Sequence, residues 1–275
     1  MAVHSEFERV REPACLRGLG NLVRKEKQAW LGTRRAWLNF LLWPLLLGGL
    51  VANMLFVPTL TNLASPEDIA AAGGAGVYAI RMGLSVFFEF GTVVVALGAI
   101  VLSQDAIIEE KTSGITEWLL SKPVARRSYL LAKMGVYSVF ILMFLVILPA
   151  IVTYALLSLR GGEFFPPLPF LGALGVMVLH TLFYLFLTLL LGVIFNSRVP
   201  LLAIGFASLL GGNVLGGLIQ PLLYVTPWIL PQTASGLATG LPLPGGLIYP
   251  PAFATLLWCL VFALAALGKF ENAEL

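Results

Sequence analysis

The sequence predicts an all-α integral membrane protein with six transmembrane helices, and three observations support this fold class. First, 59% of the 275 residues are hydrophobic and only 11% are charged, whereas about a quarter of the residues in a soluble domain are charged. Second, the apolar residues form six runs long enough to cross a bilayer. Third, if the six runs cross the membrane in turn, fifteen of the seventeen lysines and arginines fall on the same side of it. The composition excludes a water-soluble globule and a nucleic-acid-binding protein.

The chain begins with a polar, basic segment, residues 1–35, which lacks the short apolar core of a secretory signal and is therefore expected to be retained. Residues 15–35 are predicted to form a basic amphipathic helix on the inner membrane surface. Its apolar face would contain Leu16, Leu19, Val23 and Trp30. Its polar face would contain Arg17, Asn21, Arg24, Lys25 and Gln28. The alternative is a solvated basic flank with no further role.

The six apolar runs are predicted to be the membrane spans. They cover residues 36–57, 82–103, 129–157, 169–195, 199–224 and 247–268. A helix of about 20 residues crosses the hydrocarbon core at a rise of about 1.5 Å per residue. The ten-residue alternating segments of a membrane barrel are missing from the sequence. With no internal repeat and no soluble domain, residues 1–275 are expected to form one transmembrane domain.

The distribution of basic residues predicts the orientation. Residues 1–35 hold eight lysines and arginines, five more lie between residues 104 and 133, and Arg198 and Lys269 fall on the same side. The opposite side has only Arg81 and Arg160. Because lysine and arginine accumulate at cytoplasmic flanks, we expect both termini in the cytoplasm and the protein in the inner (plasma) membrane.

Three segments are expected on the outer side, at residues 58–81, 158–168 and 225–246. All are rich in proline and glycine and poor in charge. The last is apolar enough to fold back into the outer leaflet as broken helices, provided that protein shields its backbone.

The loop at residues 104–127, between spans two and three, is predicted to dock a partner. Ile115, Trp118 and Leu119 recur at helical spacing, so a helix here would present an apolar stripe outside the membrane. Gly114 is expected to separate two short helices, and Pro123 to end the second. The alternative is a hairpin packed on its own bundle.

The same loop carries an acidic cluster formed by Asp105, Glu109 and Glu110. Lys111 follows directly in the sequence. We expect Lys111 to neutralise part of this cluster.

At these motifs the sequence resembles the permease subunits of type-2 ABC exporters. That family has a basic lysine-glutamate stretch before span one, which corresponds here to residues 22–26. Its loop after span two has a pattern that corresponds here to Glu110, Gly114, Glu117, Leu119, Leu120, Pro123, Val124 and Arg126, followed by Leu130, Leu131, Ala132 and Lys133. The sequence departs from the pattern at Ile115, Thr116 and Ala125. The six-span layout extends the resemblance over nearly the whole chain.

The resemblance implies that residues 107–127 form coupling helices in a groove of a separate ATPase subunit, which residues 16–35 also contact. The implied coupling residues are Ile107, Glu110, Gly114, Ile115, Glu117, Trp118, Leu119, Pro123 and Arg126. It also implies two permease copies, as a homodimer or a close heterodimer, and two ATPase chains. The sequence has no phosphate-binding loop of the G-x-x-x-x-G-K-[ST] type. ATP and Mg²⁺ are therefore expected in the partner, and this chain is expected to have no cofactor and no enzymatic activity.

Polar residues within the spans are the candidates for the substrate pathway or gate. Glu89 is the main candidate, because a carboxylate in lipid is costly unless it faces protein or water; the alternative is a hydrogen bond to a neighbouring span. Arg81 lies about 12 Å away along the helix, too far for direct pairing. Asn213 and Gln220 would line a cavity or bond across a helix contact.

Small residues in span five, including Gly211, Gly212 and Gly216, predict a close helix contact, either within one bundle or at a dimer seam. His180 is expected to be a neutral, hydrogen-bonded bundle residue, since cysteine and histidine partners at metal-ligand spacing are missing.

Two other classes of function compete with the permease. A secondary transporter, or another polytopic protein without an ATPase, would normally show inverted repeats and several ionisable groups at the midplane. An intramembrane enzyme would need a nucleophile, a base or a metal cluster, and Glu89 with His180 is too small a set. An adjacent gene for a phosphate-loop ATPase would favour the permease.

Overall fold

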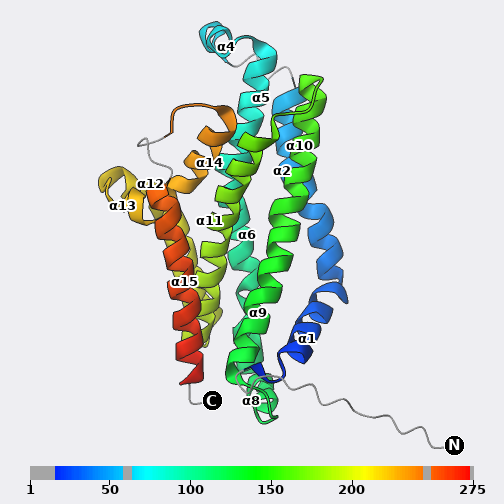
Figure 1. The fold of residues 1–275 in the computed structure, drawn as a ribbon, viewed down its shortest axis with the longest axis vertical. Helices are drawn as coiled ribbons and strands as arrows, with labels where there is room; N and C mark the ends of the chain where they lie inside the picture. Colours follow the sequence, from blue (N-terminus) through cyan, green and yellow to red (C-terminus); the bar gives the residue numbers. More distant parts are fainter. Residues whose placement is uncertain (1–15, 58–63, 244–248, 273–275) are drawn as a thin grey trace, which may run out of the picture.

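The computed structural model describes residues 16–57, 64–243 and 249–272, and within these ranges every regular element is a helix (Figure 1). The side chains of four residues inside helices lie outside this description: Leu120, Asn213, Val214 and Gly217. The all-helical fold class is therefore confirmed.

Five helices are long and apolar enough to cross a membrane. They are α2 (Arg34–Phe56), the continuous helices Ala75–Thr112 and Arg126–Gly161, α11 (Pro167–Ile194) and α15 (Tyr249–Glu271). They match five of the six predicted spans and run roughly along the long axis of the molecule (Figure 1). The chain is a multi-pass membrane protein.

Two of these long helices contain a π-helical turn. The first consists of α5 (Ala75–Ser85), the π-helix η2 (Val86–Phe90), α6 (Gly91–Ser103) and α7 (Asp105–Thr112). The second consists of α9 (Arg126–Ile141), the π-helix η3 (Leu142–Ile147) and α10 (Leu148–Gly161). Such turns are rare and frequently mark functional sites. Glu89 lies in η2.

The run at residues 199–224 differs from the single helix that its composition predicts. The helix α12 (Arg198–Leu218) ends before Gln220, and a separate turn, α13 (Leu222–Val225), follows. Pro221 explains the break, because proline disfavours helical geometry at the preceding residue and supplies no N–H. The helix α12 is shorter than the run of residues 199–224 that the apolar composition predicts as one span.

The outer segment at residues 225–246 forms broken helices, as its proline and glycine content predicts. In its described part, the 3₁₀ turn η4 (Pro227–Ile229) leads into α14 (Leu230–Thr239), most of whose residues are buried. The helix α14 packs on α11, α5 and η2, and Ser235 Oγ lies 3.1 Å from Ser85 Oγ. Protein therefore shields this backbone, which is the condition for irregular structure at membrane depth.

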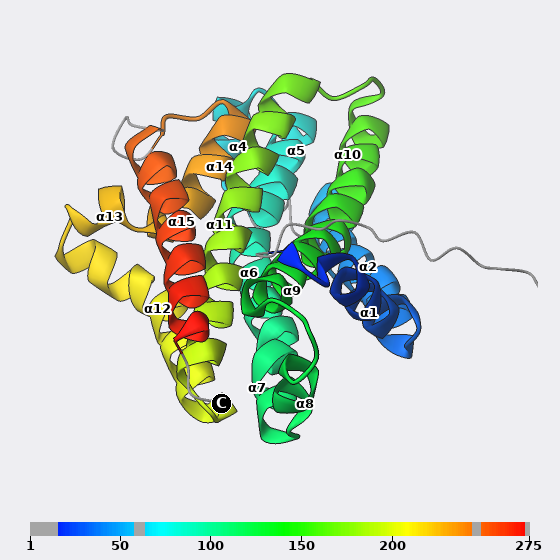
Figure 2. The same cartoon turned by 60° about the horizontal axis from the view of Figure 1, so that its bottom comes forward.

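The helix α11 lies near the centre of the bundle, in contact with α15, α14 and α6 (Figure 2). On the other side of α6, the contact between Trp43 of α2 and the α6 backbone depends on Gly98. A Cβ atom at Gly98 would lie 2.2 Å from the ring of Trp43 and 2.9 Å from Leu145. Only glycine lets the indole lie directly on the α6 backbone.

The segment predicted to form an amphipathic surface helix, residues 15–35, contains the helix α1 (Leu19–Leu31), which packs on α9. Trp30 is fully buried and stacks on Phe140 with 5.3 Å between ring centroids. The predicted polar face is wrong in one respect: Lys25 turns toward Glu110, and the neighbouring Glu26 is buried. Lys25 thus connects α1 to the loop after span two, and Glu26 connects α1 to Lys133 of α9.

Candidate functional site

The loop at residues 104–127 lies at the end of the molecule that also holds α1 and the last residues of α15 (Figures 1 and 2). It consists of α7, a turn, and α8 (Ile115–Leu120). Gly114 forms the break with φ +72°, a left-handed conformation that glycine adopts without strain. The predicted pair of short helices with a glycine between them is confirmed.

The helix α8 presents two different faces. Trp118 is 64% exposed and Ile115 is 41% exposed, and Glu117 is exposed beside them. Thr116 and Leu119 are buried against the rest of the protein. The predicted stripe of Ile115, Trp118 and Leu119 is therefore divided, because one turn of helix cannot point all three outward when its other side packs on the bundle. Lys122 Nζ lies 4.9 Å from the centre of the Trp118 ring.

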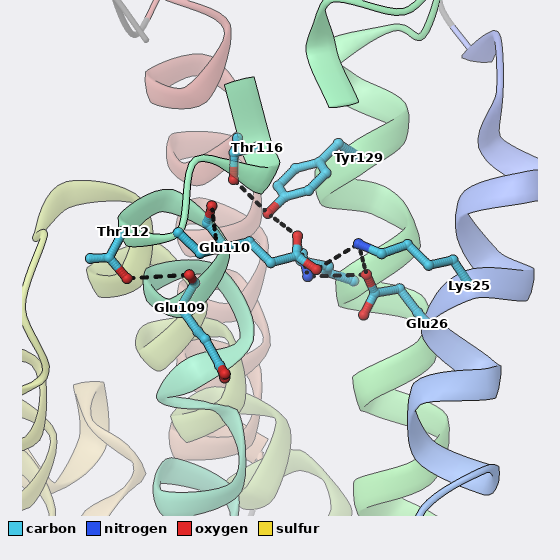
Figure 3. Close-up of polar contacts among 9 residues, drawn as sticks. Lys25, Glu26, Glu109, Glu110, Thr112, Thr116 and Tyr129 are labelled. Atoms are coloured by element: carbon cyan, nitrogen blue, oxygen red, sulfur yellow. Dashed lines mark hydrogen bonds and ion pairs between the residues drawn. The ribbon is translucent and has the colours of Figure 1, made fainter. Parts of the chain in front are cut away.

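Beneath this surface, a network of charged side chains joins α1, α7 and α9 (Figure 3). Glu110 Oε1 lies 2.6 Å from Lys25 Nζ, and Glu110 Oε2 lies 3.1 Å from Lys133 Nζ. The same oxygen accepts a hydrogen bond of 2.7 Å from the Tyr129 hydroxyl. Glu26 completes the network, with Oε1 at 3.0 Å from Lys133 Nζ and 3.5 Å from Lys25 Nζ. Two carboxylates face two ammonium groups, so the formal charges cancel.

The network continues to α8 and α15. The Tyr129 hydroxyl lies 3.4 Å from Thr116 Oγ1, and the Tyr129 ring stacks on Phe270 with 5.1 Å between centroids. Next to it, Arg127 forms an ion pair with Glu271, and Arg126 donates a hydrogen bond of 2.9 Å to the Glu271 carbonyl oxygen. The end of α15 is thus held against the loop.

On its other side, α7 is attached to the connection between α11 and α12. Lys111 Nζ donates to the carbonyl oxygens of Val193 at 3.1 Å, Phe195 at 3.2 Å and Gly192 at 3.4 Å, which lie at the end of α11. Asp105 pairs with Arg198 at 2.5 Å. The expectation that Lys111 neutralises its acidic neighbours is wrong, because the unpaired carbonyls of a helix end attract it instead.

The other predicted coupling residues are placed as follows. Ile107 is buried and packs against Gly192 of α11. A Cβ atom added at Gly192 would lie 3.4 Å from the Ile107 Cβ. Pro123 and Arg126 are exposed. The exposed candidates of the loop are thus Ile115, Glu117, Trp118, Pro123 and Arg126, whereas Ile107, Glu110 and Leu119 fix the loop to the bundle.

Within the bundle, a pocket of about 60 Å³ brings Glu89 together with residues far away in the sequence. Glu89 and Gln232 are exposed at this pocket, and His180 and Tyr184 are buried. The other lining residues are Val93, Leu209, Gly212, Trp228 and Pro231. His180 lies in the bundle as expected, but its Nδ1 has no hydrogen-bond partner.

The glycines of α12 contact segments of the same chain. A Cβ atom at Gly212 would lie 2.3 Å from the Trp228 indole, and one at Gly216 would lie 2.6 Å from Leu223. Gly211 faces no neighbouring segment within 4 Å. The side chain of Asn213 is outside the described residues, and Gln220 is exposed in the turn after α12, away from the residues lining the pocket.

Sequence reasoning missed several functional candidates. Lys133 lies near the start of an apolar run, and that position is itself a signal, because an ionisable residue in such a run needs a partner. Glu26 stood out only as the glutamate of the lysine-glutamate stretch at residues 22–26, and nothing in the sequence placed it beside Lys133. Trp228 and Gln232 were hidden in an irregular outer segment.

One comparison with known proteins identifies a family. Residues 20–275 match the family model described as "ABC-2 family transporter protein". No curated protein sequence matches the chain.

Proposed function

Because the chain belongs to the ABC-2 family of transporter proteins, we propose that it is the permease subunit of an ATP-driven exporter. It crosses the inner membrane six times, the sixth crossing being made by α12 with the segments that follow it. Both termini lie in the cytoplasm. This orientation is supported by the basic residues of α1, of the loop and of the α11–α12 connection. The loop is held to α1 by the Lys25–Glu110 ion pair and to the α11–α12 connection by the Asp105–Arg198 ion pair.

The observation that carries this proposal is the exposed apolar surface of α8, a helix whose other face is packed against the rest of the protein. Trp118 and Ile115 project from a helix whose opposite face is buried. Exposed aromatic side chains of this kind are typical centres of binding energy in protein interfaces. The partner is an ABC ATPase subunit, present in two copies, which binds ATP and Mg²⁺. The permease itself catalyses no reaction.

The contacts of α7 suggest how ATPase movement reaches the membrane. The helices η2, α6 and α7 form one continuous helix. A displacement of the loop therefore moves this helix along its length. Glu110 transmits the displacement to α1 and α9 through Lys25 and Lys133, and Lys111 transmits it to the end of α11. Two such permeases, as a homodimer or a close heterodimer, enclose the substrate pathway and rock between inward and outward states.

The test is the double variant Trp118→Ala, Glu117→Ala, co-expressed with the candidate ATPase subunit. Loss of a central aromatic typically costs about 2 kcal/mol or more, which corresponds to about a 30-fold weaker complex. We expect a folded, membrane-inserted permease that no longer retains the ATPase or no longer couples hydrolysis to transport. A matched control, Leu45→Ala with Leu264→Ala, changes two exposed leucines of α2 and α15. Full retention and full transport in the loop variant would refute the docking assignment.

A further inference from the structure

The pocket around Glu89 is assembled from four separate parts of the chain. It is formed by η2 and the start of α6, by α11, by α12, and by the segment from η4 to the first turn of α14. Its volume of about 60 Å³ is enough for a small polar group or a few water molecules. A whole drug-sized molecule does not fit. A ligand held here is therefore held by one end.

Two polar groups of this pocket have no partner in the part of the chain that the structure describes. His180 is 1% exposed, and its Nδ1 makes no hydrogen bond. Glu89 makes no ion pair and no hydrogen bond with any described residue. Buried polar atoms are almost always paired in folded proteins. The pocket thus offers the exposed Glu89 carboxylate as an acceptor at its mouth, while the unpaired His180 nitrogen is buried in its wall.

The charges of the lining select the sign of a ligand. No lysine or arginine lines the pocket, so the Glu89 carboxylate repels anions and attracts cations. A metal ion is a poor match, because no group of three histidine, cysteine, aspartate or glutamate side chains with metal-binding geometry occurs among the described residues. An organic cation with N–H donors matches the free Glu89 carboxylate.

Two aromatic side chains are fixed beside these groups. The Trp228 indole N–H donates to the Ser208 carbonyl oxygen at 2.7 Å, and the Tyr184 hydroxyl donates to the same oxygen at 3.5 Å. Gly212 leaves the space that the indole occupies against α12. Aromatic rings next to a carboxylate form the usual recognition site for ammonium groups. The walls of the pocket are therefore held in place before any ligand arrives.

We propose that this pocket binds the ammonium head group of an amphipathic substrate, with its N–H donors directed to Glu89 and the head group beside the His180 ring. The proposal rests on the proposed function, because it assigns a substrate class to the same transporter. The apolar part of the substrate remains outside the pocket, along the exposed surface next to Glu89, where Phe90 is also exposed.

Binding can be measured on the purified full-length permease without an ATPase. The probes are hexylammonium, the neutral hexanol and the anionic hexanoate, which share a six-carbon tail. The readout is tryptophan fluorescence, with Trp228→Phe as the reference that removes the local signal. We expect saturable binding of hexylammonium only, weakened at least tenfold by Glu89→Gln. The matched control is Glu163→Gln, which changes an exposed glutamate on the segment between α10 and α11.

A second variant, His180→Phe, keeps a ring of similar size. We expect it to weaken binding of hexylammonium without changing the elution volume of the protein in size-exclusion chromatography. Equal binding of hexanol or hexanoate, or unchanged binding in Glu89→Gln, would overturn the proposal. These outcomes are separate from those of the docking test. A permease that binds hexylammonium but never retains an ATPase contradicts the proposed function alone. One that couples ATP hydrolysis to transport but ignores the cation contradicts the head-group site alone.

Discussion

Lys133 Nζ lies 3.0 Å from Glu26 Oε1, and the two side chains are only 2% and 6% exposed. This ion pair attaches the helix α1 to α9 away from water, at the end of the molecule that holds the loop at residues 104–127. A buried charge is tolerated only with its partner, so the two residues are expected to depend on each other.

Removal of one partner is expected to destabilise the protein more than removal of both. Lys133→Met leaves Glu26 buried without its closest cation, and such breaks typically cost about 3–5 kcal/mol. The double variant Lys133→Met, Glu26→Met should recover a large part of this loss. Thermal unfolding of the detergent-solubilised protein measures both effects. Lys27→Met, on the exposed face of α1, is the control and should change little; equal melting of Lys133→Met and the parent protein would contradict the pairing.

The glycine beneath Trp43 gives a second test. Gly98→Ala places a Cβ atom 2.2 Å from the Trp43 ring and 2.9 Å from Leu145, so α2 must shift away from α6. Overpacking of this kind typically costs about 1–3 kcal/mol, and a lower melting temperature is expected. Gly135→Ala in α9 is the matched control, because its Cβ would meet no atom within 4 Å. If both variants melt together, the close contact is not present in the protein.

Lys111 is expected to stabilise the end of α11. Lys111→Met removes the ammonium donor shared by three carbonyl oxygens, and hydrogen bonds to a charged group contribute about 1.5–3 kcal/mol. Faster amide hydrogen exchange should appear in the last turn of α11 and at the start of α12. Lys122→Met, an exposed lysine of the same loop, should leave that exchange unchanged. Exchange that stays equal in both variants would show that the carbonyls do not need the lysine.

The orientation predicts which cysteine reporters react from outside. In a background with Cys15→Ser and Cys259→Ala, Thr112→Cys at the end of α7 should be shielded from a membrane-impermeant thiol reagent. Ala71→Cys in the helix α4 (Pro66–Ala72), at the opposite end of the molecule (Figure 1), should be labelled. Both positions are exposed, so burial does not decide the result. The reverse labelling pattern would refute the proposed topology.

The long helices and the two short helices of the loop could be predicted because their signals are local. Apolar runs of sufficient length identify membrane helices, and Gly114 marks its turn because few other residues adopt its backbone conformation. The break near Pro221 was also readable, since proline interrupts helices. Composition alone does not show this break, because apolar residues continue on both sides of Pro221.

The partners of individual side chains could not be predicted. A helical wheel places Lys25 on the polar face of α1 but does not show that Glu110, on another helix, lies there too. Similarly, Glu89 and Gln232 come from segments separated by most of the chain, and only the packing of α14 on η2 places both at one pocket. Tertiary packing, unlike helix length, has no local signature in a single sequence.

The attachment of α15 to the loop has a practical consequence for labelling and purification. Phe270 stacks on Tyr129 and Glu271 binds Arg127, so the carboxyl end of this helix lies beside the proposed docking surface. A bulky tag or fluorescent protein fused directly after α15 would occupy the space next to the surface that we propose as the ATPase docking site. Fusions there would mimic a loss of partner binding unless a long, flexible linker separated them from the helix.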